Sequence, residues 1–182
     1  MTPRDKDKTA DADMSIDVMI DSDVWKKHPG AEDTVRKAVA EAMRVSPHTP
    51  AEMAVVLTDD AAMQVLNKRW RGKDKPTNVL SFPAQTTLGA AAPHLGDIVI
   101  AFEITALEAE REGKPFAHHL THLAVHGYLH LLGHDHETDR EAKAMERLET
   151  KILARIGIPD PYGELAPKEL AGHEAATLKS HA

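Results

Sequence analysis

One short pattern of histidines constrains this chain more than any other feature. His126, His130 and His136 follow the spacing H-x-x-x-H-x-x-G-x-x-H, with Gly133 between the second and the third. Residues four apart share one face of a helix, so the first two imidazoles can reach one point. Gly133 permits a left-handed turn that ends the helix and brings His136 back to that point. The pattern predicts a helix, a sharp turn and three converging imidazoles.

Three converging imidazoles form a site for a divalent metal ion, with zinc as the favoured ion and a fourth coordination position left open to water. We expect a single Zn²⁺ per chain, held by His126, His130 and His136. The same spacing occurs in a class of zinc proteases in which a glutamate follows the first histidine and acts as the general base. This chain has Gly127 there. The metal ligands are therefore retained, and ordinary metalloprotease chemistry is disfavoured.

The segment around the first two histidines is apolar. No Lys, Arg, Asp or Glu occurs from Pro115 to Leu132, which is typical of a buried helix. A buried imidazole without a polar partner costs on the order of a few kcal/mol, and a shared metal ion satisfies several imidazoles at once. We expect His122 to support a ligand or to be hydrogen bonded in the core rather than to bind metal, and His134 to face solvent or substrate. The pattern assigns no role to His118 and His119.

The composition bounds the remaining possibilities. With 182 residues, 42% of them hydrophobic, a single domain with a sizeable core is expected. The absence of cysteine excludes disulfides and thiolate ligands. No apolar run long enough for a membrane span and no signal peptide are visible, so we expect a soluble, cytoplasmic protein without membrane contact. A net charge of −7 excludes a basic field over the whole surface.

One local segment departs from this acidic average. Residues 68–75 carry five cations and one anion around Trp70. By itself the segment fits either a solvated helix end with its loop or a local contact for a polyanion.

The hydrophobic periodicity predicts an α+β fold, in which a small mixed four-stranded sheet packs with about five helices. Thr58 is the expected N-cap of the second helix, and residues 138–141 read as a capping box that opens the last one. Expected strands lie near residues 15–21, 52–57, 77–82 and 97–101. Outside a domain spanning residues 14–160, we expect a disordered arm at 1–13 and a flexible tail at 161–182.

Two segments taken together resemble the YbeY family of bacterial endoribonucleases, which act in ribosomal RNA maturation. One contains Leu66-Asn67 and the run from Trp70 to Pro83, and the other runs from His122 to His136; Gly96-Asp97-Ile98 fits as well. The similarity spans about residues 14–160. Two positions depart from the common family pattern: Asn78 stands where Asp is frequent, and His134 where Tyr is frequent. Neither removes an expected metal ligand.

The resemblance implies a zincin-like His helix and a single-strand-specific, zinc-dependent endoribonuclease. Its expected roles are ribosomal RNA processing, including maturation of the 3′ end of small-subunit rRNA, and ribosome quality control. Its partners would be precursor rRNA and the ribosome or its proteins. The implied catalytic set is Arg71 with the three histidines, and the implied RNA contacts are Arg69, Arg71, Lys73 and Lys75. A guanidinium suits this role because it can grip a phosphate with two hydrogen bonds and stabilise charge in the transition state.

Two other functions remain open at this level. A peptidase would need a carboxylate base from elsewhere, for which Asp135, Glu137 and Asp139 are candidates. A non-catalytic ribosome assembly factor would hold its zinc in a closed structural site, with His122 or His134 as a fourth protein ligand.

Overall fold

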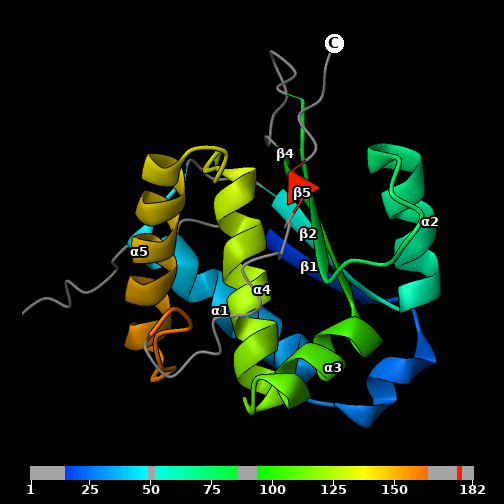
Figure 1. Cartoon of the computed structure of the whole chain (residues 1–182). Coiled ribbons are helices and arrows are strands. Elements are labelled where there is room, and N and C mark those ends of the chain that lie inside the picture. Colours follow the sequence, from blue (N-terminus) through cyan, green and yellow to red (C-terminus); the bar gives the residue numbers. More distant parts are fainter. Residues whose placement is uncertain (1–14, 49–51, 86–93, 164–175, 178–182) are drawn as a thin grey trace, which may run out of the picture.

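The computed structural model describes residues 15–48, 52–85, 94–163 and 176–177. The predicted α+β fold is confirmed, with five α-helices around a mixed sheet (Figure 1). The helices are α1 (Ala31–Val45), α2 (Asp60–Arg71), α3 (Phe102–Arg111), α4 (Phe116–Leu131) and α5 (Asp139–Arg155), and a 3-10 helix η1 spans Asp23–Lys27. The strands are β1 (Ser15–Ile20), β2 (Glu52–Thr58), β3 (Val79–Pro83), β4 (His94–Ala101) and β5 (Ala176–Thr177).

The sheet has the order β1-β2-β4-β3-β5. Strands β1, β2 and β4 are parallel, and β3 runs antiparallel to β4 with Ser81 opposite Ile98. The two residues of β5 add a fifth, parallel strand beside β3. This strand was not anticipated, and it lies in the segment for which a flexible tail was expected.

The helices cover both faces of the sheet. On one face, Ile98 and Ile100 join a core with α1, α4 and α5. On the other face, Val99 and Leu80 pack against Met63 of α2. This alternation is the period of two expected for a strand buried on both sides. Helix α4 runs between α5 and the strands in Figure 1 and contacts both.

The start of α2 corrects one prediction. Its N-cap is Asp59, whose side chain accepts a hydrogen bond from the backbone N–H of Ala62 at 2.9 Å. Thr58 is instead the last residue of β2 and is buried, and its carbonyl accepts a hydrogen bond from Trp25 Nε1 at 2.8 Å. Both residues are good N-caps by type; the length of the β2–β4 ladder decides between them, because Thr58 is still paired with Ala101.

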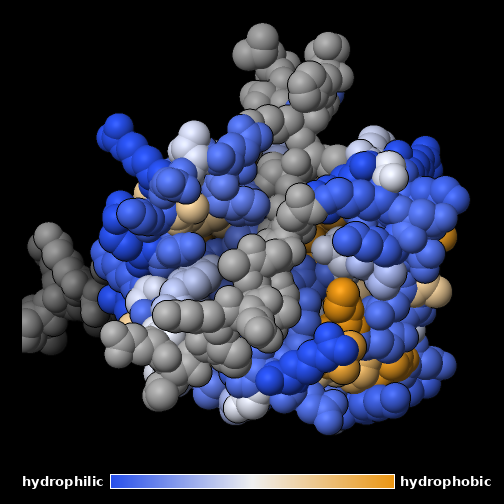
Figure 2. Space-filling model, viewed as in Figure 1, coloured by the Kyte–Doolittle hydropathy of each residue, from blue (hydrophilic) through white to orange (hydrophobic). Residues whose placement is uncertain are grey.

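Hydrophilic residues dominate the face shown in Figure 2, and apolar patches on it are small. Within the described residues, no helix combines the length and the apolar character that crossing a membrane requires.

Candidate metal centre

Helix α4 ends where the glycine spacing predicts. Gly133 has a φ of +91°, in the left-handed region. The N–H of Gly133 donates to the carbonyl of His130 at 3.0 Å, and the N–H of His134 donates to the carbonyl of Leu129 at 3.1 Å. These two bonds form a Schellman motif, which reverses the chain and carries His136 back toward the helix.

The three histidines converge. The Nε2 atoms of His126 and His130 lie 3.0 Å apart, and one ring nitrogen from each of the three histidines lies within 4.8 Å of the others. His126 is 9% exposed and His130 is 1% exposed. Among the described residues no fourth His, Asp or Glu joins this group, so the geometry brings together three candidate ligands.

The ring tautomers explain why this arrangement suits a cation. His130 Nδ1 lies 2.8 Å from the carbonyl oxygen of His134; a carbonyl can only accept, so Nδ1 must carry the proton. His126 Nδ1 likewise donates to the carboxylate of Glu149. In the neutral form of both rings, the two Nε2 atoms therefore present lone pairs to each other. His136 Nε2 is buried with no hydrogen-bond partner in the described structure. These donors fit a divalent metal ion bound by neutral imidazoles.

The pKa of His130 supports the same protonation state. Burial, together with the charges of His126 and His136, lowers this pKa to about 3. The imidazole is therefore neutral near pH 7, which is the form that binds metal.

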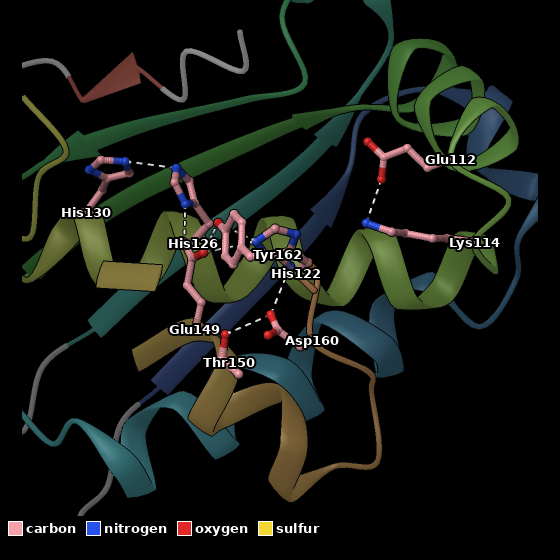
Figure 3. A network of polar contacts seen from close by, with 9 residues as sticks. All are labelled: Glu112, Lys114, His122, His126, His130, Glu149, Thr150, Asp160 and Tyr162. Atoms are coloured by element: carbon pink, nitrogen blue, oxygen red, sulfur yellow. Dashed lines mark hydrogen bonds and ion pairs between the residues drawn. The ribbon is translucent and has the colours of Figure 1, made fainter. Parts of the chain in front are cut away.

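Glu149 of α5 bonds to Nδ1 of His126, on the opposite side of the ring from the Nε2 atom that faces His130. Its side chain is fully buried, and its carboxylate accepts from His126 Nδ1 and from the Tyr162 hydroxyl. His122 Nε2 lies 3.1 Å from the same carboxylate (Figure 3). Burial raises the pKa of Glu149, but the charges and hydrogen bonds of His126 and His122 outweigh it, so the pKa lies below its usual value. An ionised carboxylate of this kind fixes the ligand's tautomer and increases its basicity.

Neither Glu149 nor Tyr162 is among the site residues that the sequence pattern predicts. One signal was available for Glu149, because it shares the buried face of α5 with Met145, Ile152 and Leu153, and a glutamate in an apolar stripe needs a partner. Tyr162 carried no comparable signal. It follows the predicted domain end at residue 160, yet its hydroxyl reaches the carboxylate.

The structure separates the other histidines by environment. His122, His126 and Glu149 also lie close enough to form a ligand group, but their mutual hydrogen bonds occupy these atoms. His119 pairs with the buried Glu108 at 2.7 Å. His134 contributes its backbone carbonyl to His130, and His118 is partly exposed.

The turn after α4 leads directly into α5. Thr138 Oγ accepts from the N–H of Glu141 at 3.2 Å, and Glu141 Oε2 accepts from the N–H of Thr138 at 3.1 Å. The predicted capping box is therefore present. It fixes the start of α5 two residues after His136, and Asp135 accepts from the N–H of His136 at 2.8 Å.

The basic segment lies on another element. Arg71 is the last residue of α2, and its Nη1 lies 3.4 Å from Asn67 Oδ1. Helix α2 packs on the sheet face opposite α4, although the C-terminal ends of the two helices lie toward the same end of the sheet in Figure 1. The structure thus brings the three histidines together and places Arg71, Arg69, Lys73 and Lys75 across strand β3 from them.

Packing explains the glycine at position 127. A Cβ atom there would lie 2.8 Å from Ile98 Cγ2, and Ile98 is fully buried. The backbone carbonyl of Gly127 also accepts a hydrogen bond from Ser81 Oγ at 3.1 Å. Position 127 therefore faces the sheet, where a glutamate side chain has no space.

We expect Gly127→Glu to destabilise the protein by roughly 3 kcal/mol or more, because it overpacks the core and buries a charge. It should not create peptidase activity. Chemical denaturation measures the stability, and a casein substrate tests the activity. Gly30→Ala is the comparison, since Gly30 has an ordinary φ of −83° and a Cβ there meets no atom within 4 Å. Equal stability of Gly127→Glu and the wild type would contradict the packing argument.

The chain is similar to known proteins over most of its length. A family model described as Endoribonuclease YbeY matches residues 20–157. Proteins named Endoribonuclease YbeY from Rhodopseudomonas palustris strains BisA53 and BisB18 are 55% and 56% identical to this chain over 156 residues. The alignments cover 82% of this chain and 91% and 93% of those proteins. A solution structure of TM1509 from Thermotoga maritima has a TM-score of 0.49 and 22% identity, covering 78% of this chain and 91% of that one.

Proposed function

This chain belongs to the YbeY endoribonuclease family, and we propose that it is a zinc-dependent endoribonuclease that cleaves single-stranded regions of ribosomal RNA precursors. The zinc dependence is inferred from the Nε2 atoms of His126 and His130, which lie 3.0 Å apart. The Nε2 atom of His136 beside them has no hydrogen-bond partner in the described structure. We further propose the 3′ end of small-subunit rRNA as the substrate region, and a cytoplasmic role in ribosome quality control with the ribosome as partner. The family relationship supports these finer assignments.

The residues of the site have separate roles in this proposal. His126, His130 and His136 would hold the zinc ion, which would supply Lewis-acid activation of the phosphodiester and of water near neutral pH. Glu149 and the carbonyl of His134 hold the ligand rings through their Nδ1 protons. Arg71 would bind a phosphate and stabilise negative charge in the transition state. An RNA strand reaching both sites would have to pass strand β3, which lies between them.

The alternative functions are less well supported. A peptidase needs a carboxylate base, but position 127 has no space for one and Asp135 is bonded to the backbone of His136. A closed structural zinc site needs a fourth protein ligand, and none joins the three histidines among the described residues. The open site and the basic segment together favour RNA cleavage.

The decisive experiment compares a single-stranded RNA with casein as substrates, each with and without a chelator. We expect chelator-sensitive cleavage of RNA and no cleavage of casein. His126→Ala should remove RNA cleavage together with zinc. Arg71→Glu should remove cleavage but retain both fold and zinc, because it places a negative charge where a phosphate binds.

Two results would reject this function. Chelator-sensitive cleavage of casein that disappears in His126→Ala would identify a peptidase. Zinc-loaded protein that cleaves neither substrate would instead indicate a non-catalytic factor. Arg71→Glu that cleaves RNA at the wild-type rate would remove Arg71 from the catalytic set and leave the assignment of the reaction intact.

A further inference from the structure

The two tryptophans of the chain lie in opposite environments. Trp25 is 1% exposed in the core, whereas Trp70 is 52% exposed at the end of α2. Trp70 nevertheless has a defined position: its ring contacts Phe82 edge-on, with centroids 6.0 Å apart, and Arg69 Cζ lies 5.3 Å from its centroid. An aromatic ring that is held by its neighbours and open to solvent can accept a second planar group at little entropic cost.

Cations are frequent on the helix turn that carries Trp70 and on the loop that follows it, and one of them, Lys68, is ion-paired with Asp74 at 3.0 Å. Gly72, with a φ of +70°, ends α2 in the left-handed conformation, and the following loop turns back along the helix. Asn67 fixes the loop, because its buried Nδ2 donates to the carbonyl of Lys75 at 2.8 Å. The cations on this turn and loop are Lys68, Arg69, Arg71, Lys73 and Lys75.

The Lys73 ammonium group lies close enough to two other cations to be affected by their charges. Partial desolvation, together with the charges of Arg71 and Lys75, lowers the pKa of Lys73. A ligand that carries several negative charges relieves such repulsion. The cations at the end of α2 also complement the helix dipole, but Lys73 and Lys75 lie beyond the helix, where the dipole does not account for them.

We propose that Trp70 is a stacking platform for one base of single-stranded RNA, with Arg69, Lys73 and Lys75 binding the phosphates next to that base. This inference rests on the proposed ribonuclease function and deepens it. An aromatic face combined with a positively charged surface is the chemistry by which proteins bind single strands without reading their sequence. Bases in a duplex are already stacked on each other, so the platform selects unpaired RNA.

The position of Trp70 separates binding from cleavage. Phe82 contacts Trp70. Ser81 precedes Phe82 on β3, and its Oγ donates to the carbonyl of Gly127 on α4 at 3.1 Å. Trp70 and the histidines thus lie on opposite sides of one strand. The stacked base is some distance along the RNA from the bond that is cleaved, so its loss should raise KM and leave kcat nearly unchanged.

The test uses the zinc-loaded full chain and a short 2′-O-methyl oligouridylate, which lacks the free 2′-hydroxyl. In the wild type, binding should quench the fluorescence of the exposed Trp70, while Trp25 stays shielded. The fluorescence anisotropy of a dye-labelled oligonucleotide gives the affinity of the wild type and of each variant. Trp70→Leu keeps an apolar side chain but loses the aromatic face, and it should bind the oligonucleotide roughly 5- to 100-fold more weakly. Trp70→Phe should recover part of this affinity. Val65→Ala, at another exposed apolar residue of α2, should bind as the wild type does.

Inorganic polyphosphate, which has charge but no bases, serves as the second probe. Trp70→Leu should bind it as tightly as the wild type. Equal oligonucleotide affinity of Trp70→Leu and wild type would overturn the platform, as would an equal loss of affinity for polyphosphate. In both cases wild-type RNA cleavage would leave the proposed function standing. A wild type that neither binds nor cleaves RNA would reject the function itself.

Discussion

Replacing His130 by alanine is expected to remove nearly all bound zinc and all metal-dependent activity. His130 is the most buried of the three ligands, at 1% exposure, and its protonated Nδ1 is fixed on the carbonyl of His134, so Nε2 is held as a donor toward the metal. Removing a metal ligand should cost more affinity than the roughly 10- to 100-fold typical of removing a group that only supports a ligand. Elemental analysis of the purified variant measures the result.

The control for this experiment is His118→Ala. His118 lies on the same helix but outside the ligand group, so this variant should retain wild-type zinc content. Circular dichroism should show that both variants keep their helices. Full zinc occupancy in His130→Ala would exclude His130 as a ligand and would require another donor in its place.

The second large effect is expected at Glu149, the buried carboxylate behind His126. Glu149→Gln keeps the shape of the side chain but replaces an acceptor oxygen by a donor amide, while His126 Nδ1 and the Tyr162 hydroxyl both donate to this carboxylate. Zinc affinity should fall roughly 10- to 100-fold. Glu149→Ala leaves these buried groups without an acceptor and should also cost about 3–5 kcal/mol of stability.

Competition titration with a zinc chelator separates the two effects, because affinity can be compared between folded proteins. Glu146→Gln, on the same helix but outside the hydrogen-bond network, should bind zinc as the wild type does. Tyr162→Phe removes one donor and should weaken binding less than Glu149→Gln does. If folded Glu149→Gln binds zinc with wild-type affinity, the carboxylate only stabilises the core and does not tune the ligand.

Tyr162 shows that the packed part of the chain continues beyond α5, the last helix with a clear hydrophobic stripe. Its hydroxyl bonds to Glu149 and lies 3.2 Å from His122 Nε2, and Asp160 accepts from Thr150 Oγ1 at 3.1 Å (Figure 3). Burial and the charge of Glu149 raise the pKa of Tyr162 above its usual value, so the hydroxyl keeps its proton and remains a donor. The segment after α5 is therefore part of the support of the metal centre.

Features that depend on local geometry can be predicted from the amino-acid sequence alone. The converging histidines require only helical spacing and a left-handed glycine, and the start of α5 requires only the residues of its capping box. These interactions join residues at most ten positions apart. The strands can likewise be predicted from the sequence, because the side chains of a buried or half-buried strand show its pattern without reference to other segments.

Features that depend on packing between distant segments are seen only in the tertiary structure. Glu149 reaches His126 across 23 positions of sequence only because α5 packs on α4, and Ile98 excludes a side chain at position 127 only because α4 packs on β4. The choice of Asp59 over Thr58 as N-cap depends on the β2–β4 ladder, and the placement of Arg71 across β3 from the histidines depends on which sheet face α2 covers. A sequence pattern shows that a face is buried but not what buries it, because the partner is set by chain topology and side-chain fit.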